Sequence, residues 1–309
     1  MGKILVTGGD GFIGKHLINY LLNKNYDIVK LNRNSLINGS KVNDLRNVNN
    51  WTEIFDDVET VFHLAAFVHV SKKNKIKNSK INREINVDLT KSIALGAAQA
   101  GVKKFIFLSS IGVLGKNNKN KSFNCNSEYN PYSDYTFSKK DAELELLSID
   151  KDFEMQISII RAPLVYGKGS SGNFEKLQKL IQFHFPLPFY LIKNNKRSYI
   201  GINNLISFLE KLVLINTLKS DIYNISDNQD ISTFELIQIL KKYSKSKSLI
   251  FPLPIYFIKL ILNLINKPQW INSMIYSLEI DCSVEMKKLN WNPPFTIEEE
   301  IKKIFDGIK

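Results

Sequence analysis

The sequence has few cysteines and histidines. Of its 309 residues, two are cysteine and four are histidine. The two cysteines, Cys125 and Cys282, argue against a disulfide scaffold or a cysteine-rich metal site, and the scattered histidines show no metal-ligand spacing. We therefore expect no metal centre. The N-terminus runs directly into an apolar segment and shows no signal-peptide pattern, which favours a cytoplasmic location.

Long uninterrupted apolar runs are also missing. The longest apolar stretch extends from Ile250 to Ile265 and is broken by Pro252, Pro254 and Lys259, so it is too short and too irregular to span a bilayer. We expect no transmembrane segment. Two interpretations of the stretch remain open: a helix packed in the core of a smaller lobe, which we favour, or an amphipathic helix at a membrane interface.

Acidic residues are fewer than basic ones. The chain has 42 lysine and arginine residues against 30 aspartate and glutamate residues, a net charge of +12. The lysines are spread along the chain, and a local excess between Lys72 and Lys80 is typical of a solvated loop. No nucleic-acid-binding motif is present, so we expect no nucleic-acid partner, whereas a basic pocket would suit a small anionic ligand.

Apolar runs alternate with helical periods in the first half of the chain. This alternation predicts an α/β fold with a parallel, doubly wound sheet. Strands are expected at Lys3–Val6, Asp27–Leu31, Thr60–Leu64, Lys104–Leu108 and Gln156–Ile160, and helices at Phe12–Leu22, Arg83–Ala100 and Ser133–Ser148. The regularity fades after Gly167. We place a dinucleotide-binding domain at residues 1–167 and a smaller C-terminal lobe for the substrate at residues 168–309, and later segments can return to the first domain.

A glycine-rich turn follows the first predicted strand. Gly8, Gly11 and Gly14 are spaced by two residues each, and an amphipathic stretch begins at Phe12. Glycine is needed where the backbone turns tightly or approaches a ligand closely. The start of the following helix offers free N–H groups to a pyrophosphate. The strand–turn–helix context therefore indicates a dinucleotide site.

Three side chains predict the chemistry. Tyr135 and Lys139 lie four residues apart and share one face of a predicted helix. A lysine ammonium beside a phenol favours the phenolate, so Tyr135 can exchange a proton near neutral pH. Ser110 ends a predicted strand, at the sheet edge where ligands bind, and its hydroxyl can hold the reacting oxygen. Ser110 could instead merely cap the strand end, but its spacing to Tyr135 favours catalysis.

Taken together, these features resemble the extended short-chain dehydrogenase/reductase superfamily, in its nucleotide-sugar epimerase/dehydratase branch. The motifs that carry the resemblance are Thr7-Gly8-x-x-Gly11-Phe12-Ile13-Gly14, Asp44-Leu45, His63-Leu64-Ala65-Ala66, Asn86, Ser109-Ser110, Tyr135-x-x-x-Lys139, Arg161-Ala-Pro163-x-Val-Tyr166-Gly167, the segment from Arg197 to Leu205, and Leu289-Asn-Trp291. The resemblance covers essentially the whole chain. It implies a Rossmann-type domain, an NAD or NADP cofactor, a UDP-sugar substrate and a homodimer.

The resemblance also assigns residues. It implies catalysis by Ser110, Tyr135 and Lys139, with Lys139 also binding the nicotinamide ribose. It implies substrate binding by Ser110, Asn173 and Arg197, with the guanidinium gripping the nucleotide diphosphate. It implies cofactor binding by Gly8, Gly11, Phe12, Ile13, Asn32, Arg33, Asp44, Leu45, Leu64, Ala65, Ala66, Asn86, Ser109, Tyr135, Lys139 and Pro163.

Several of these assignments have structural alternatives. Asp44 either bonds the adenine or caps a turn. Asn86 either contacts the cofactor or bonds to backbone beneath the site. Ser109 is either a structural hydroxyl or faces the cofactor. Arg197 could instead form a surface salt bridge.

One position departs from NAD-preferring relatives, which carry an acidic residue after the second strand. This chain has Asn32 there, followed by Arg33. Removing the carboxylate removes repulsion against a 2′-phosphate, and the arginine can bind one. We favour NADP over NAD, although Arg33 as a loop arginine would leave NAD accepted.

The resemblance implies a reaction at C4 of the sugar. Our preferred interpretation is a 4-ketoreductase of a UDP-4-keto-6-deoxy-N-acetylhexosamine in the synthesis of surface-glycan precursors. The alternative is a UDP-glucose or UDP-N-acetylglucosamine 4-epimerase, and a remote one is a non-catalytic dinucleotide-binding scaffold. Dehydratase relatives need an acid/base pair after the catalytic serine, where this chain has Ile111 and Gly112, so 4,6-dehydration is disfavoured.

Overall fold

The computed structural model describes residues 2–32, 36–37, 40–41, 44–48, 50–68, 75–118, 121–215, 219–264 and 274–306. Its largest element is a six-stranded sheet in the order β10-β7-β6-β5-β1-β2, in which every neighbouring pair is parallel. The strands are β1 (Lys3–Thr7), β2 (Ile28–Leu31), β5 (Val58–His63), β6 (Lys104–Ser110), β7 (Gln156–Ala162) and β10 (Asp221–Asn224). The predicted Rossmann-type sheet is thereby confirmed.

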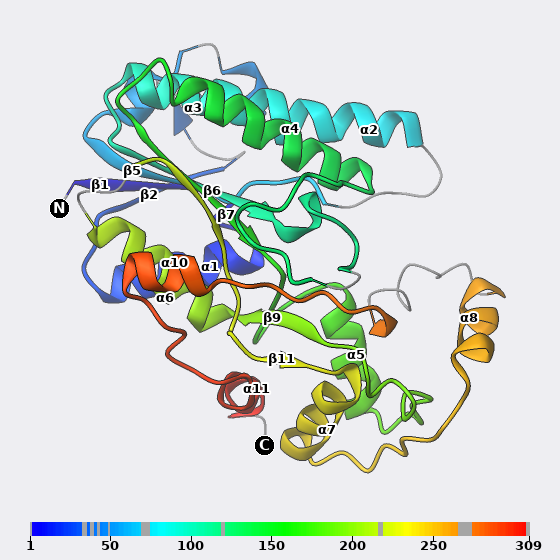
Figure 1. Cartoon of the computed structure of the whole chain (residues 1–309). Helices are drawn as coiled ribbons and strands as arrows, with labels where there is room; N and C mark the ends of the chain where they lie inside the picture. The colour runs from blue at the N-terminus through cyan, green and yellow to red at the C-terminus, as the bar shows by residue number, and fades with distance from the viewer. Residues whose placement is uncertain are drawn as a thin grey trace.

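Helices cover both faces of this sheet (Figure 1). One face carries α2 (Lys75–Arg83), α3 (Leu89–Gln99) and α4 (Asp134–Ile149), and the other carries α1 (Phe12–Asn23), α6 (Ile202–Leu214) and α10 (Ser283–Leu289). Alternate strand residues therefore enter different cores. In β1, Leu5 packs in the core under α3 and α4, whereas Ile4 and Val6 pack in the core under α1 and α6.

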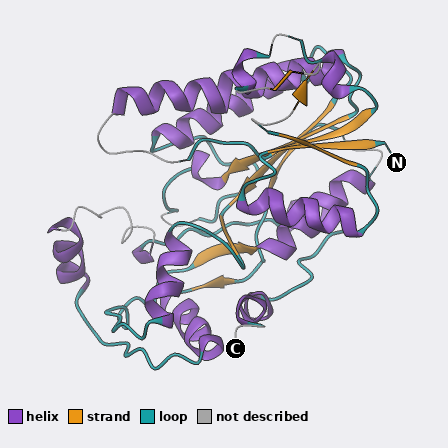
Figure 2. Cartoon of the chain, turned by 180° about the vertical axis from the view of Figure 1, so that it is seen from behind, coloured by secondary structure: helices purple, strands orange, loops and turns teal. Residues whose placement is uncertain are grey.

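A smaller sheet lies beyond the carboxyl ends of the large one. It has the order β11-β9-β8, with β8 (Leu164–Tyr166) parallel to β9 (Arg197–Gly201) and β11 (Asp230–Ile231) antiparallel to β9. Helices α5 (Asn173–Gln182), α7 (Thr233–Ser244) and α11 (Ile297–Phe305) surround it and share its core (Figure 2). Short elements complete the described chain: β3 (Leu36–Ile37), β4 (Ser40–Lys41), η1 (Leu45–Asn47), η2 (Thr52–Phe55), η3 (Glu84–Asp88), η4 (Ile111–Val113) and α8 (Ile255–Leu264).

The chain crosses between the two sheets more than once. After β8 and β9 it returns through α6 and β10 to the large sheet, and α10 packs there as well. Leu205, Tyr223 and Trp291 belong to the same core cluster as Val6. The division after Gly167 thus remains a prediction, and the large sheet itself includes residues from both sides of it.

The predicted elements agree with the structure in kind, and most of their ends fall within two residues. The exception is the helix expected at Arg83–Ala100. Helix α2 begins at Lys75, inside the lysine-rich run that we interpreted as a solvated loop, and continues through the π-helical segment η3 into α3. The solvated-loop interpretation is therefore wrong for residues 75–80. Lysine is a good helix former, so a charged face does not exclude a helix.

The apolar stretch from Ile250 forms a helix only in part. Helix α8 covers Ile255–Leu264, and Ile265 lies outside the described residues. Ile258 is buried in the core of the smaller sheet, whereas Tyr256 is 72% and Phe257 50% exposed. The expected core helix is thus packed on one side only. Within the residues that the structure describes, no helix is long and apolar enough to cross a membrane.

Candidate active site

The glycine-rich turn brings the ends of β1 and β5 into close contact. Gly8 has φ +71°, and a Cβ atom there would lie 2.6 Å from the backbone nitrogen of Ala65. A Cβ atom on Gly14 would lie 2.3 Å from the carbonyl oxygen of Gly8. Only glycine fits at these two positions. The N-cap of α1 is Gly11, which offers no side-chain cap, so the first N–H groups of α1 remain available to an anion.

Ser110 ends β6 at the neighbouring carboxyl edge of the sheet. Its Oγ accepts a hydrogen bond from the Gly112 amide at 3.2 Å, so the serine does cap the short turn η4. The hydroxyl proton is still free to be donated elsewhere. A Cβ atom on Gly112 would lie 3.3 Å from Ser110 Oγ, 2.8 Å from Thr136 Cγ2 and 3.5 Å from the Tyr132 hydroxyl. The serine hydroxyl therefore faces the start of helix α4.

Helix α4 is fixed at that point by its capping box. Ser133 is the N-cap and accepts from the Thr136 amide, while the Thr136 hydroxyl accepts from the Ser133 amide. These two bonds provide hydrogen-bond partners for the backbone N–H groups of Ser133 and Thr136. The cap sets the first turn of α4, which bears Tyr135, beside Ser110. The structure thus brings the three predicted catalytic residues to one edge of the large sheet.

The ionisation of the two predicted catalytic residues on α4, Tyr135 and Lys139, differs from our expectation. Lys139 is buried, its Nζ donates to the Leu108 carbonyl at 2.9 Å, and it lies 4.3 Å from the centroid of the Phe107 ring. Burial lowers the pKa of Lys139 to about 7. Burial also raises the pKa of Tyr135 to about 12, with a further contribution from Tyr132. The expected lowering of the Tyr135 pKa by Lys139 is therefore not found, because burial of the phenol disfavours the phenolate.

A buried ion pair joins helix α4 to the large sheet near the predicted catalytic residues. The Arg161 Nη2 of β7 donates to Glu143 Oε2 of α4 at 2.7 Å, and both side chains are buried. The Glu143 carboxylate also accepts from the hydroxyls of Ser109 and Tyr129. Ser109 is thus bonded inside the protein, in accord with the structural alternative. Glu143 was missed by sequence reasoning, although it continues the four-residue spacing of Tyr135 and Lys139.

Asn86 holds the loop after β5 onto helix α4. Its amide group donates to the Phe67 carbonyl at 3.0 Å and to Ser138 Oγ at 2.9 Å, and its oxygen accepts from the Phe67 amide at 2.7 Å. The side chain is fully buried in η3. Asn86 therefore bonds to the backbone beneath the site, which is the structural alternative given above for this residue. The same loop contains Leu64, Ala65 and Ala66, which are half-buried beside the glycine turn.

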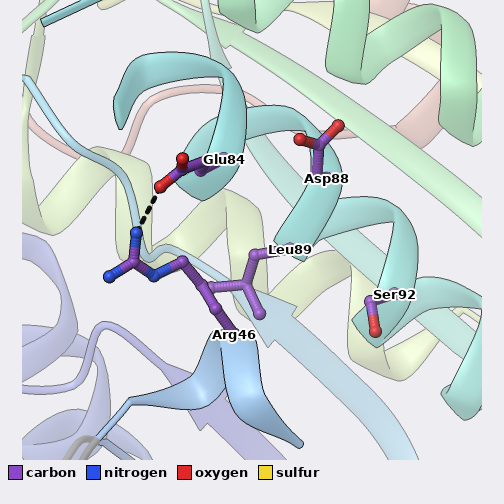
Figure 3. A pocket seen from close by; sticks show the side chains of 5 residues that line it. All are labelled: Arg46, Glu84, Asp88, Leu89 and Ser92. Carbon is purple, nitrogen blue, oxygen red and sulfur yellow. Dashed lines mark hydrogen bonds and ion pairs between the residues drawn. The ribbon is translucent and has the colours of Figure 1, made fainter. Parts of the chain in front are cut away.

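Asp44 and Leu45 lie at the start of η1. Asp44 caps that turn, because its carboxylate accepts from the Arg46 amide at 3.0 Å, and it also pairs with the Arg46 guanidinium. Leu45 is buried in the core beneath α3. Arg46 pairs with Glu84 as well, next to a pocket of about 330 Å³ on the outer surface (Figure 3). The pocket is also lined by Asp88, Leu89 and Ser92.

The end of β2 has a neighbour that the sequence did not reveal. The Asn32 amide group donates to Asp10 Oδ2 at 2.9 Å, and Lys30 also pairs with the Asp10 carboxylate. Lys30 lowers the pKa of Asp10, so this residue stays ionised. A carboxylate from the glycine turn thus lies beside Asn32, the position after β2 at which the sequence has no acidic residue. Arg33 lies outside the described residues.

Asn173 and Arg197 line one pocket of the smaller lobe, together with Tyr199, Thr233 and other residues. Arg197 is 8% exposed, and its Nη1 donates to the Tyr276 carbonyl at 2.5 Å. Its Nε has no hydrogen-bond partner, and no ion pair with it is found in the described part of the chain. The surface-salt-bridge alternative is therefore not supported, because the guanidinium is buried.

The remaining residues that were predicted to bind the cofactor lie on the neighbouring elements. Phe12 and Ile13 begin α1 and are half-buried, and Pro163 is buried between β7 and β8. His63 is fully buried between Thr7 and Thr90, and burial lowers its pKa to about 3, so it is a neutral core residue. Within the residues described, no three metal-ligating side chains gather into a site that could hold an ion.

Known proteins resemble this chain over its full length. The NAD dependent epimerase/dehydratase family matches residues 4–225. A UDP-glucose 4-epimerase from Vibrio cholerae is 32% identical over 97% of this chain and 94% of its own length. A Bacillus cereus UDP-glucuronic acid 4-epimerase in complex with NAD superposes with a TM-score of 0.78 at 21% identity, covering 99% and 98% of the two chains.

A second type of relative shares the fold. A dTDP-4-dehydrorhamnose reductase from Bacillus anthracis, in complex with NADP, superposes with a TM-score of 0.76 at 18% identity and covers all of both chains. The two solved structures show the fold, while the family match and the Vibrio cholerae relative show descent. The chain therefore belongs to the NAD-dependent epimerase/dehydratase family of nucleotide-sugar enzymes.

Proposed function

We propose that this protein is an NAD(P)-dependent oxidoreductase that acts at C4 of a UDP-sugar. The observation that carries the proposal is the position of Ser110 against the first turn of α4, which bears Tyr135, at the sheet edge formed by the glycine turn. This edge is where open parallel sheets bind their ligands. A proton donor, a hydrogen-bond donor and a dinucleotide cradle meet there.

The residues present fit a nicotinamide dinucleotide. The glycine turn leaves no room for a Cβ atom at Gly8 or Gly14, and α1 begins without a side-chain cap, so its N–H groups can bind the pyrophosphate. When bound, the dinucleotide supplies or accepts the hydride at C4. Lys139 would hold the nicotinamide ribose.

The protein's own groups handle the proton and the oxygen. With its pKa raised to about 12, Tyr135 is protonated at neutral pH. In the reductive direction, the phenol donates this proton to the C4 oxygen. Ser110 donates a hydrogen bond to the same oxygen and holds it in line with the phenol. Such proton transfer typically contributes roughly 100- to 10,000-fold to the rate.

Arg197 is our candidate for the UDP diphosphate. A buried guanidinium with an unsatisfied Nε is a poor arrangement for stability alone, because burying a cation without an anionic partner is unfavourable. A diphosphate would supply that partner through charge-assisted hydrogen bonds. Asn173 lines the same pocket and would contact the nucleotide.

We favour reduction of a UDP-4-keto-6-deoxy-N-acetylhexosamine, a step in surface-glycan precursor synthesis. The pair of Asn32 and Arg33 in the sequence supports NADPH as the reductant. Ile111 is buried and Gly112 has no space for a side chain. Both facts argue against the acid/base pair that dehydration requires.

A UDP-hexose 4-epimerase is the second candidate. The similarity to the Vibrio cholerae 4-epimerase supports it, as does the Asp10 carboxylate beside Asn32. An acidic group at this place suits the 2′-hydroxyl of NAD better than a 2′-phosphate.

Incubation with UDP-sugars and UDP-4-keto-6-deoxy sugars, each with NADH or NADPH, distinguishes the candidates by mass spectrometry and sugar analysis. A gain of two hydrogens by the keto sugar supports the reductase. An unchanged mass with inverted C4 configuration supports the epimerase. Absence of turnover on every UDP-sugar, with cofactor bound, would refute both reactions and leave the scaffold interpretation.

A further inference from the structure

Large apolar side chains are exposed at the end of the molecule that carries α8. Phe183 is 71%, Leu249 66% and Tyr256 72% exposed, and Phe185, Phe257 and Leu260 are about half exposed. We call these six residues the aromatic surface. Their exposure is unusual, because large apolar side chains that gather at one end of a globular protein are normally buried against the rest of the fold.

The aromatic surface belongs to one structural unit. The loop after α5 pairs with the segment before α8, since the Leu187 amide donates to the Leu249 carbonyl at 2.8 Å and the Phe251 amide donates to the Leu187 carbonyl at 3.0 Å. Helix α8 begins four residues after Phe251 and lies at the periphery beyond α5 (Figures 1 and 2). Ile258 anchors α8 to the core, so the exposed side chains are held outward by a packed element.

The net positive charge of the chain is concentrated in two longer stretches of sequence that contain these segments. Residues 176–209 and 236–278 contain eleven of the 42 basic residues and none of the 30 acidic ones. The rest of the chain has 31 basic and 30 acidic residues, a net charge of +1. Four of the lysines, Lys193, Lys196, Lys245 and Lys247, are exposed on the two segments that pair. Almost the whole net charge therefore lies in the segments that bear the aromatic surface.

We propose that the aromatic surface docks onto a membrane rich in anionic lipids. Exposed aromatic and aliphatic side chains on segments that carry lysine and no aspartate or glutamate are the composition of surfaces that lie at a lipid interface. Two lysines of the longer stretches, Lys179 and Lys242, pair with Glu175 and Glu298, whereas no ion pair of Lys193, Lys196, Lys245 or Lys247 is found among the described residues. A second copy of this chain fits poorly, because two such surfaces would bring together the like charges of Lys193, Lys196, Lys245 and Lys247. Helix α5 begins at Asn173 and ends just before Phe183, so the pocket that Asn173 lines lies about one helix length, roughly 15 Å, from the aromatic surface. The inference does not depend on the reaction.

Cosedimentation of the full chain with lipid vesicles tests the proposal. We expect binding to an equal mixture of phosphatidylcholine and phosphatidylglycerol and little binding to phosphatidylcholine alone. Binding should weaken between 0.1 M and 1 M salt, over which the screening length falls from about 10 Å to about 3 Å.

Two pairs of substitutions separate the apolar and charge contributions. Phe183→Ser with Phe185→Ser should weaken vesicle binding at least tenfold, because the rings would no longer enter the interface. Lys245→Gln with Lys247→Gln should weaken it about fivefold for each lysine.

Matched controls lie on the other side of the molecule. Val284→Ser removes an apolar side chain that is 59% exposed next to Glu285, and Lys151→Gln removes an exposed lysine between two aspartates. Both should bind vesicles like the wild type. Far-UV circular dichroism would show that all four variants are folded.

Three results would overturn the proposal. The first is no preference for anionic vesicles. The second is a Phe183/Phe185 variant that binds as well as the controls, since charge alone would then explain the binding. The third is a serine variant that changes the oligomeric state in light scattering, which would show that a second copy covers the surface.

Discussion

Lys139 should destabilise the ligand-free protein at neutral pH, and this effect should disappear in alkali. Its ammonium is buried, which lowers its pKa from the ordinary 10.5 to about 7. Each tenfold change in proton affinity is worth about 1.4 kcal/mol. At pH 7 the buried amine therefore reduces the free energy of unfolding by about 4 kcal/mol relative to a lysine that stays solvated.

The direction of the pH dependence follows from the protons bound. Between pH 7 and 10.5 the unfolded chain keeps the proton on this lysine, while the folded chain has released it. Stability therefore rises with pH through this window, and the penalty is fully present below it. Between pH 7 and pH 10, the contribution of Lys139 should change by about 3 kcal/mol.

Urea denaturation of wild type and Lys139→Met from pH 7 to pH 10 measures this change. The variant also leaves the Leu108 carbonyl without its donor, which costs about 1–3 kcal/mol at every pH, so only the pH-dependent part of the difference is diagnostic. Relative to the variant, the wild type should gain about 3 kcal/mol over the range. Lys140→Met, at a half-exposed neighbour, should show a constant difference. A constant difference for Lys139→Met as well would refute the burial argument.

The other predictions concern catalysis, cofactor, substrate and the supporting ion pair. Tyr135→Phe should lose at least nine-tenths of turnover while retaining cofactor affinity by fluorescence titration, since only the ionisable oxygen is removed. Arg33→Ala should weaken NADP(H) binding by about 1–3 kcal/mol and leave NAD(H) binding nearly unchanged, and equal losses for both would contradict the NADP preference. Arg197→Lys should raise the KM for the UDP-sugar and weaken titrated UDP, because lysine lacks the bidentate fork; equal UDP affinities would place the diphosphate elsewhere. Glu143→Gln should lower the free energy of unfolding by about 3–5 kcal/mol by leaving the Arg161 charge buried without its partner, and calorimetry would measure the loss.

The sequence predicted those parts of the fold that depend on local pattern. The strands of the large sheet are short apolar runs, and the catalytic helix follows a serine that caps it, so their positions could be read from spacing and composition. The start of α2 could not be predicted in this way, because a lysine-rich run is as compatible with a solvated helix as with a loop. Tertiary packing decides between them, and Asn86 in η3 contacts Ser138 of α4 to make that packing specific.

The sequence predicts candidate site residues by type, but it does not predict the groups that they contact. The spacing of Tyr135 and Lys139 correctly places both on α4, yet it cannot show that the Leu108 carbonyl takes the ammonium. The position of Ser109 beside Ser110 gives no sign that its hydroxyl bonds to Glu143, 34 residues away. Such contacts join separate elements of the sheet and its helices, so only the assembled fold contains them.

The environment of Asn32 shows why this limitation matters for function. The absence of an acid after β2 pointed to NADP, because the inference considered only the residues adjacent in sequence. In the fold, the Asp10 carboxylate arrives from the glycine turn and accepts from Asn32, while Lys30 balances its charge. If the ribose binds at the end of β2, a 2′-phosphate beside this group would be repelled by Asp10 and attracted by Lys30, whereas a 2′-hydroxyl could donate directly to Asp10. The identity of residue 32 alone therefore does not decide between NAD and NADP, because the Asp10 carboxylate and the Lys30 ammonium lie beside it.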